Sequence, residues 1–368
     1  MVPPPSNRLR WAVAALALVV LAVALGPRER FDDRWVEPDP TGDLDEWLAA
    51  REARVPGIRA GDQKAIVWAD PVGREATPIA VVYLHGFSAD RHEIEPVLTD
   101  LASEMGFNVF FTRLRGHGRD GPAMAEAAVE GWLDDTAEAV AIGSRIGERV
   151  VVMGTSTGGT LATWAANRPE AVDRIDGVVL VSPNYQPRDR SSRVLLYPWG
   201  SVIAGLVLGE QRCFTPENDD QARHWTTCYP TSALSTMMAL VEHVRTMDVT
   251  AVRAPTLVLY DPADQVVDPT ETERVIAGLV STSPTLYQVR SSSDPAHHVL
   301  AGDIISPASS NEVASVLRSF LVTLSNEPAP VADRTTASSA RVGRLAGREC
   351  LPGRSGRPDE HRPGARCR

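Results

Sequence analysis

The chain has 368 residues, of which 43% are apolar, 23% charged and 6% aromatic, and its formal net charge is -10. This composition is typical of a globular protein and excludes disorder throughout, while the length allows one domain with insertions or two domains. The negative net charge argues against a nucleic-acid-binding protein, because negative charge repels the phosphate backbone.

The N-terminus predicts a membrane-targeting segment. Residues 11–26 carry no charge and follow Arg8 and Arg10, and because the run is apolar on every face, a buried core helix is disfavoured. It is shorter than the about 20 residues that span a bilayer, and the Ala-Val-Ala triplet at 22–24 offers a cleavage site. We expect residues 1–30 to be a signal-anchor or a cleaved signal peptide, so that the body is exported and either membrane-anchored or secreted or periplasmic.

Strand-like and helix-like blocks alternate between about residues 53 and 325. Apolar runs predict strands at 65–70, 79–86, 108–114, 149–154, 177–183, 255–261 and 285–289, and apolar spacings of three and four predict helices at 90–105, 129–146, 160–170 and 272–280. Several of these strands are too continuously apolar for a half-exposed sheet. We expect an α/β fold with a mostly parallel central sheet flanked by helices, at residues 31–325.

One long connection interrupts the alternation, at about 184–250. Connections of this length within a compact domain are usually elements in their own right, and the helical patches here predict an inserted helical cap. Residues 194–208 carry few polar groups, so we expect one face of this segment to bury against the catalytic domain or against lipid.

A single serine is closely bracketed by glycines in the stretch VVMGTSTGGTLATWAA, residues 151–166. Gly154, Ser156 and Gly158 form the pattern G-x-S-x-G, with Gly159 following, between a strand-like and a helix-like block. This context predicts a nucleophile elbow, in which the serine lies exposed on a sharp turn. A phosphate-binding loop is disfavoured because the lysine of that motif is absent.

A nucleophilic serine needs a base to accept its proton and an acid to orient that base. The strand at 255–261 leads into DPADQVVDP, which offers Asp261, Asp264 and Asp268, and the strand at 285–289 is followed by His297 and His298. The order serine, aspartate, histidine suits such a site. From the residues alone, the choice among the aspartates and between the histidines stays open.

Five segments together resemble the α/β-hydrolase superfamily, and within it the serine aminopeptidase and monoglyceride-lipase-like branch. They are YLHGFSADRHE, RLRGHGRDG, GTSTGGT, LVLYDPADQVVDP and DPAHHVLAGD, and the resemblance covers about residues 65–323. It implies that Asp264 is the acid, that His298 is the base, and that the backbone N–H groups of Phe87 and Thr157 form the oxyanion hole.

The same resemblance implies a structural role for four other polar residues of these segments. His85 is expected to shape the loop that follows its strand, and Arg113, Arg115 and His117 to arrange a turn, with binding of a phosphate or carboxylate as the alternative for these three.

Two cysteines lie in the expected cap and two in the C-terminal segment. Cys213, His224 and Cys228 lack an evident fourth zinc ligand. In an exported protein we therefore expect a disulfide between Cys213 and Cys228, with two free buried thiols as the alternative. No metal and no cofactor are expected.

The C-terminal residues 326–368 lose apolar periodicity and are rich in Arg, Gly and Pro, which predicts a disordered tail; it contains Cys350 and Cys367.

The sequence as a whole predicts a serine hydrolase that cleaves carboxylic esters through an acyl-enzyme. Lipophilic acyl esters such as monoacylglycerol-like substrates are expected, with the membrane as partner through the N-terminal segment and no nucleic acid. An aminopeptidase-like amidase or an acyltransferase with the same residues is the alternative, because these activities differ in pocket and acceptor. A non-catalytic binding protein on a hydrolase fold is the alternative of another class.

Overall fold

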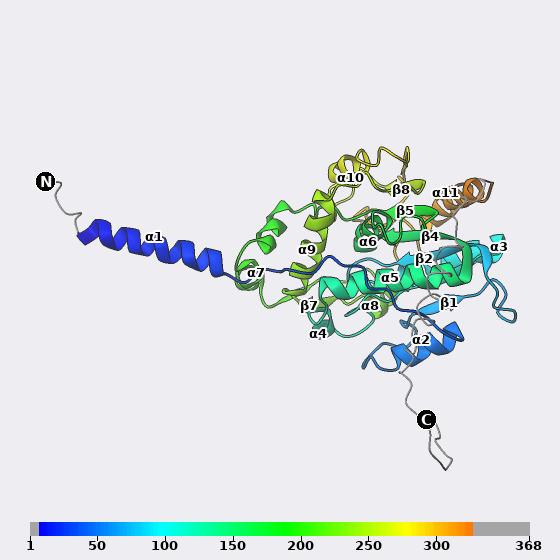
Figure 1. Ribbon diagram of the computed structural model, residues 1–368, viewed down its shortest axis with the longest axis horizontal. Coiled ribbons are helices and arrows are strands. Elements are labelled where there is room, and N and C mark those ends of the chain that lie inside the picture. Colours follow the sequence, from blue (N-terminus) through cyan, green and yellow to red (C-terminus); the bar gives the residue numbers. More distant parts are fainter. Residues whose placement is uncertain (1–6, 327–368) are drawn as a thin grey trace, which may run out of the picture. The chain divides into compact units, whose positions relative to one another are not determined.

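The computed structural model describes residues 7–326 of the chain (Figure 1). The predicted tail, apart from Asn326, and its two cysteines lie outside the described residues.

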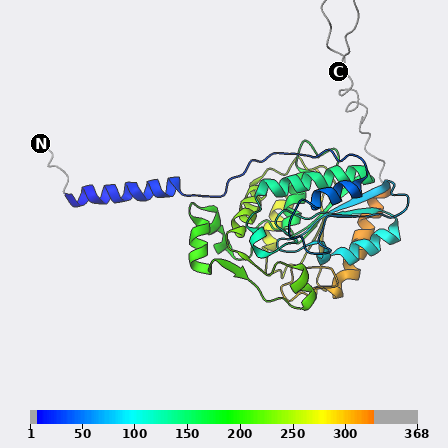
Figure 2. The ribbon, with the colours of Figure 1, turned by 90° about the horizontal axis from the view of Figure 1, so that it is seen from below.

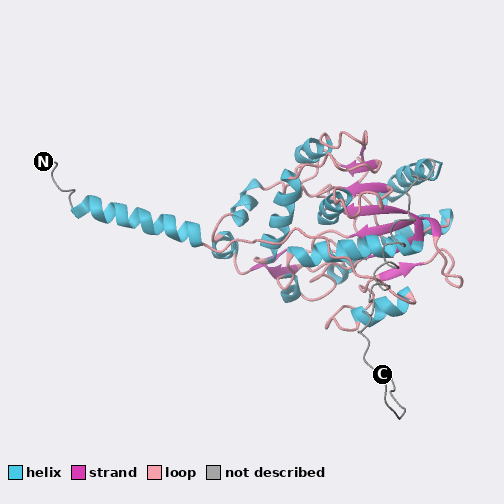
Figure 3. Cartoon of the chain, in the orientation of Figure 1, coloured by secondary structure: helices cyan, strands magenta, loops and turns pink. Residues whose placement is uncertain are grey.

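Seven strands form one sheet in the order β1-β3-β2-β4-β5-β8-β9. Only β1 is antiparallel to its neighbour, and the other neighbouring pairs are parallel (Figure 3). The strands are β1 (Ala65–Val67), β2 (Thr77–Leu84), β3 (Asn108–Phe111), β4 (Gly147–Thr155), β5 (Gly177–Val181), β8 (Thr256–Tyr260) and β9 (Thr285–Gln288). The expected α/β class and its mostly parallel sheet are confirmed.

Helices cover both faces of this sheet (Figure 2). The helices are α1 (Asn7–Leu25), α2 (Leu44–Glu52), α3 (Glu95–Met105), α4 (Gly121–Met124), α5 (Val129–Ile146), α6 (Thr157–Ala166), α7 (Gly200–Leu208), α8 (Asp219–His224), α9 (Ala233–Thr246), α10 (Pro269–Ile276) and α11 (Pro307–Asn326), with short 3-10 helices η1 (Arg91–Glu93) and η2 (Arg190–Leu196).

Two separate hydrophobic cores explain why the central strands are continuously apolar. Val82 of β2 packs in one core, with residues of α5, α6 and α9, whereas its neighbour Val81 packs in the other, with residues of α3 and α11. Alternate side chains of a strand point to opposite faces, so a strand buried on both faces has no polar positions.

Four of these helices, α3, α5, α6 and α10, correspond to the predicted ones, whereas α2 and α11 were not predicted. Four residues of α11 are buried, Val313, Leu317, Leu321 and Leu324. They recur every three or four positions, and this spacing could have predicted the helix.

The connection between β5 and β8 contains η2, α7, α8, α9 and the strands β6 (Gln211–Cys213) and β7 (Cys228–Pro230). β6 and β7 pair antiparallel with Cys213 opposite Cys228, so the cap is helical except for this hairpin. Leu195 and Ala204 pack in the main core, whereas much of α7 beyond them is exposed to solvent.

The N-terminal helix α1 buries none of its residues. Among the described residues it is the one helix long and apolar enough to cross a membrane, by length and composition. The segment after it is held against α6: Trp35 stacks on Trp164, with ring centroids 5.4 Å apart, and Asp33 accepts a 2.8 Å hydrogen bond from the Trp164 indole N–H.

Candidate active site

Ser156 lies at the turn from β4 into α6. Its φ of 52° and ψ of -114° place a non-glycine residue in a sparsely populated conformation. The turn is held by the Ser156 N–H, which donates to the Val181 carbonyl at 2.8 Å, and by the Ser156 carbonyl, which accepts from Asn184 N at 3.0 Å. The geometry is that of the strained elbow expected from the sequence.

The three elbow glycines lie where a side chain does not fit. A Cβ at Gly154 would overlap the backbone of Gly158, and one at Gly158 would overlap the Leu84 carbonyl of β2. A Cβ at Gly159 would approach the Pro183 Cβ to 2.9 Å. The tight turn and its contact with β2 therefore require glycine at these positions.

His298 and Asp264 form a hydrogen-bonded pair whose side chains are 12% and 2% exposed. His298 Nδ1 lies 2.8 Å from Asp264 Oδ2, while Asp264 Oδ1 accepts hydrogen bonds from the backbone N–H groups of Val266 at 2.7 Å and Val267 at 2.9 Å. Burial favours neutral imidazole, but the Asp264 carboxylate outweighs it and raises the pKa of His298 above its ordinary value. The arrangement suits a base that is oriented by an acid.

The neighbouring candidates are engaged elsewhere. His297, at a φ of 58°, pairs instead with Asp261, at 2.9 Å, and its side chain is 37% exposed against 12% for His298. Asp268 caps α10 by accepting from Thr270 N. The sequence offered three aspartates as the acid. Within the part of the chain that the structure describes, Asp264 is the one of the three whose side chain is hydrogen-bonded to His298.

The strand order brings these residues to one edge of the sheet. Ser156 follows β4, Asp264 follows β8 and His298 follows β9, and these strands are parallel within one sheet. Carboxyl ends of parallel strands share an edge, where loops build ligand sites.

The loop after β2 lies against the serine. A Cβ at Gly86 would come within 3.5 Å of Ser156 Cβ, which places the following residue, Phe87, beside the elbow. Thr157 is the first residue of α6, so its N–H lacks an intrahelical acceptor and is free to bind an oxyanion. The assignment of Phe87 and Thr157 to an oxyanion hole stays a prediction that this geometry fits.

Glu93, which was not expected from the sequence to belong to this site, lies behind the loop that follows β2. Its Oε1 accepts 2.7 Å hydrogen bonds from Gly86 N and from the Tyr83 hydroxyl, which also contacts Thr155 Oγ1. Burial raises the pKa of Glu93 to about 7. Glu93 thus holds in place the loop that carries Phe87. It is the last residue of the segment YLHGFSADRHE, and its position there is the signal from which its role could have been predicted.

The polar residues expected to be structural make internal contacts. His85 Nε2 lies 3.0 Å from Leu114 N, and burial lowers the pKa of His85 to about 4, so it is a neutral acceptor. Arg113 makes a buried two-pronged ion pair with Glu52, and burial lowers the pKa of His117 well below its ordinary value.

Cys213 and Cys228 are joined by a disulfide across the β6–β7 hairpin. The hairpin leads into an apolar cluster of Tyr229, Ala233 and Met124, against which Phe87 packs.

Comparison with known proteins gives a family match over most of the sheet. Residues 76–289 match the family model described as "Serine aminopeptidase, S33". The chain is also similar to the thermostable monoacylglycerol lipase of Bacillus sp. (strain H-257), with 24% identity over 250 residues, covering 65% of this chain and 90% of the relative.

Solved structures resemble this fold at low sequence identity. One comes from work on LipS and LipT, two metagenome-derived lipolytic enzymes, with 18% identity, a TM-score of 0.57, and coverage of 73% of this chain and 100% of that one. Another is a soluble variant of monoglyceride lipase from Saccharomyces cerevisiae in complex with a substrate analog, with 14% identity, a TM-score of 0.53, and coverage of 82% and 100%. At these identities the likeness shows the α/β-hydrolase fold.

Proposed function

The chain belongs to the serine aminopeptidase family of α/β-hydrolases, and on that premise we propose that it is a serine esterase that cleaves lipophilic acyl esters, such as monoacylglycerol-like substrates, at a membrane surface. The His298–Asp264 pair, at the same edge of the sheet as the Ser156 elbow, carries the hydrolytic part of the proposal.

In the proposed reaction, Ser156 Oγ attacks the ester carbonyl while His298 takes the hydroxyl proton. Asp264 holds the imidazole and stabilises the imidazolium that forms. The N–H groups of Phe87 and Thr157 bind the oxygen that becomes negative. His298 then protonates the leaving alcohol, and water attacks the acyl-enzyme with His298 again as base, which releases the acid and restores Ser156.

The apolar cluster at Phe87 supports a lipophilic acyl group. The ring of Tyr229, from the cap, packs edge-on against Phe87, with centroids 5.2 Å apart, and Ala233 and Leu234 of α9 join the same cluster. The side chains packed against Phe87, next to the predicted oxyanion hole, are therefore apolar and come partly from the cap. Each acyl methylene buried there contributes about 0.8 kcal/mol.

The exposed face of α7 supports a membrane location. Leu206 is 82% and Val207 75% exposed, and Val202 and Leu208 are also exposed. Contiguous exposed apolar surface of this kind marks an interaction site. Trp199, just before α7, donates from its backbone N–H to the Pro27 carbonyl at 2.8 Å and from its indole N–H to the Ala22 carbonyl at 2.9 Å, so α7 adjoins the end of the apolar helix α1 (Figure 1).

Whether residues 194–208 bury an apolar face against the catalytic domain or against lipid was left open by the sequence. Leu195 is buried in the main core and Leu206 points into solvent, so we assign the acyl contact to the cluster at Phe87 and the lipid contact to α7. We propose that α1 anchors an exported catalytic domain; mass analysis of the mature N-terminus distinguishes this from a cleaved signal and a secreted or periplasmic enzyme.

A substrate series tests the proposed specificity. We expect kcat/KM to rise from acetyl through butanoyl to octanoyl esters of one alcohol, with up to about fourfold per buried methylene. Leu234→Gln is expected to flatten this rise, while Leu286→Gln, at an exposed position of β9, leaves it unchanged. A preference for acetyl esters contradicts the lipophilic part, and a preference for aminoacyl amides, or transfer to an added alcohol instead of water, replaces it with the peptidase or acyltransferase alternative.

A vesicle assay tests the membrane part. Leu206→Glu and Val207→Glu are expected to reduce hydrolysis of an octanoyl ester dissolved in lipid vesicles while leaving hydrolysis of a water-soluble butanoyl ester unchanged. If each variant hydrolyses the vesicle-bound ester at the wild-type rate, as it does the soluble ester, α7 does not contact lipid.

A further inference from the structure

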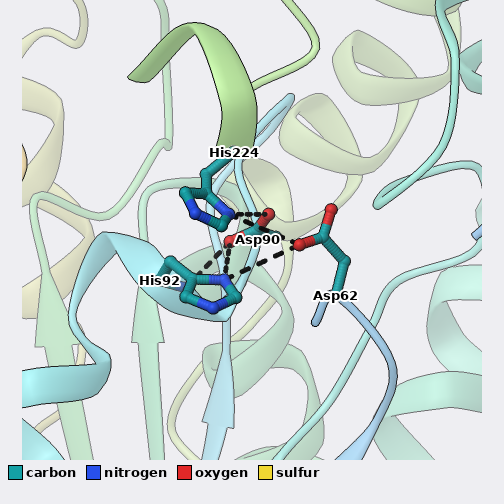
Figure 4. A group of neighbouring side chains, drawn as sticks. All are labelled: Asp62, Asp90, His92 and His224. Atoms are coloured by element: carbon teal, nitrogen blue, oxygen red, sulfur yellow. Dashed lines mark hydrogen bonds and ion pairs between the residues drawn. The ribbon is translucent and has the colours of Figure 1, made fainter. Parts of the chain in front are cut away.

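A cluster of ionisable side chains lies outside the proposed active site, where the cap meets the catalytic domain (Figure 4). It consists of Asp62, which precedes β1, Asp90 and His92, which lie in and after the loop that follows β2, and His224, the last residue of α8 in the cap. Segments far apart in the sequence thus bring two carboxylates and two imidazoles together.

The potential ligand atoms lie within 4.8 Å of one another. His224 Nδ1 is 3.4 Å from both Asp62 Oδ1 and Asp90 Oδ2, and His92 Nδ1 is 3.7 Å from Asp62 Oδ1 and 2.9 Å from Asp90 Oδ1. A tetrahedral ion with bonds of about 2.0–2.1 Å places its ligand atoms about 3.3 Å apart. The spacings of 3.4 and 3.7 Å are close to this edge, whereas the 2.9 Å contact is a hydrogen bond to Asp90 Oδ1 that an ion would replace. The rings of His92 and His224 are stacked with centroids 3.8 Å apart, so they would separate on binding.

Several of these atoms are buried without a hydrogen-bond partner. Asp62 is 2% and Asp90 1% exposed, and Asp62 Oδ1, Asp90 Oδ2 and His224 Nδ1 have no hydrogen-bond partner among the described residues. Figure 4 shows all three atoms directed toward the centre of the cluster. These atoms meet one another only in ion-pair contacts of 3.4 Å, and Arg59 Nη2 approaches Asp90 Oδ2 to 3.6 Å. Contacts of this length satisfy buried polar atoms poorly, and a cation held between them would satisfy them better.

Other residues already support the ligands from outside. Arg59 Nε donates to Asp62 Oδ2 at 2.6 Å, which leaves Oδ1 to face the centre. His92 Nε2 lies 3.4 Å from Glu95 Oε2, on the ring side opposite to Nδ1. Metal-ligating histidines typically have such a carboxylate partner on the second ring nitrogen, which fixes the tautomer and ring orientation.

We propose that Asp62, Asp90, His92 and His224 bind a zinc ion. Imidazole nitrogens suit zinc and similar first-row metals, whereas calcium and magnesium prefer oxygen ligands alone. Two carboxylates neutralise the charge of the ion, and the side chains of His92 and His224, 23% and 14% exposed, leave it a path of entry.

The site would join the cap to the loop that carries Phe87. Asp90 is three positions beyond Phe87, and His224 belongs to the cap. A hydrogen bond from Thr226 N to the Ser88 carbonyl at 2.7 Å already links the same two segments. Zinc would strengthen this link. No metal was expected from the sequence, because the irregular spacing of these four residues matches no common zinc motif and His224 stands out there only beside the cysteines of the cap.

Metal titration of the full chain tests the proposal independently of ester hydrolysis. The protein, freed of metal with a chelator, is titrated with Zn²⁺ against a chromophoric competitor, and Co²⁺ is used as a spectroscopic substitute. We expect one tight site per chain, a visible Co²⁺ spectrum of four-coordinate type, and a rise in Tm on adding Zn²⁺.

Matched variants locate the binding. Asp62→Asn and His224→Gln are each expected to weaken Zn²⁺ binding by more than the roughly 10–100-fold caused by losing an outer partner. His243→Gln is the control, because His243 is another cap histidine paired with an aspartate, Asp33, at 3.0 Å.

Absence of a tight site in the wild type, or wild-type affinity in the Asp62→Asn/His224→Gln double variant, overturns the proposal. If a variant fails to fold by circular dichroism, the wild-type Co²⁺ spectrum decides: an octahedral spectrum, or none, rejects the site.

Discussion

Replacing Glu93 by glutamine is expected to change how the stability of the protein depends on pH. Burial is the main reason that the pKa of Glu93 rises from its ordinary value of 4.5 to about 7 in the folded protein. Below pH 4.5 the group is protonated in both the folded and the unfolded state. Between 4.5 and 7 only the unfolded state releases the proton, so the stability that Glu93 contributes is lost as the pH rises through this window.

The size of this loss follows from the two pKa values. A difference of about 2.5, at about 1.36 kcal/mol for each pKa unit, corresponds to about 3 kcal/mol. Glutamine keeps a carbonyl oxygen that accepts from Gly86 N and the Tyr83 hydroxyl but does not titrate. The free energy of unfolding of Glu93→Gln, relative to wild type, should therefore rise by about 3 kcal/mol between pH 4 and pH 9.

Urea unfolding followed by circular dichroism at a series of pH values measures this difference. Glu126→Gln, at an exposed position, is the control and should show a nearly constant difference. A constant difference for Glu93→Gln as well, or a variant that becomes relatively less stable as the pH rises, would show that the folded protein holds Glu93 as a carboxylate at neutral pH.

Further predictions concern the proposed acid, base and disulfide. Asp264→Asn should lower kcat by about 10⁴-fold, as expected for loss of the acid that orients the base, whereas Asp261→Asn should have little effect; the reverse result in an ester assay would exchange their roles. Because Asp264 raises the pKa of His298 above 6.5, the acid limb of the profile of kcat/KM against pH should have its midpoint above 6.5, and a midpoint below it contradicts that interaction. Non-reducing peptide mapping of protein from an oxidising compartment should recover Cys213 linked to Cys228, whose reduction costs about 3 kcal/mol by loop entropy, and free alkylation of both thiols rules the bond out.

The sheet could be predicted from sequence because its strands are buried on both faces. Runs such as Val150–Met153 have no polar positions, and only a covered, mostly parallel sheet accommodates several of them. The helix α11 was missed although its buried positions recur regularly. The hairpin β6–β7 was missed because strands of three residues carry too little pattern to be distinguished within a cap.

The candidate site was predictable only in part, because some of its contacts depend on how distant segments pack and not on the local sequence. The glycines around Ser156 reveal the elbow, since the backbone itself demands them. His297 and His298 are adjacent and follow the same strand, so only the left-handed turn at His297, which aims that ring at Asp261, separates them. The cluster of Asp62 and His224 depends on the cap folding back onto the catalytic domain, which no spacing along the chain records.

Covalent labelling of Ser156 tests the central claim most directly. The full chain is treated with a fluorophosphonate and digested, and mass spectrometry locates the adduct, while hydrolysis of an octanoyl ester is followed in parallel. We predict an adduct on the peptide containing Ser156, with labelling and hydrolysis both lost in a Ser156→Ala variant that keeps the wild-type circular dichroism spectrum. Labelling at another residue, or ester turnover that persists in the folded variant, would contradict the assignment of Ser156 as the nucleophile.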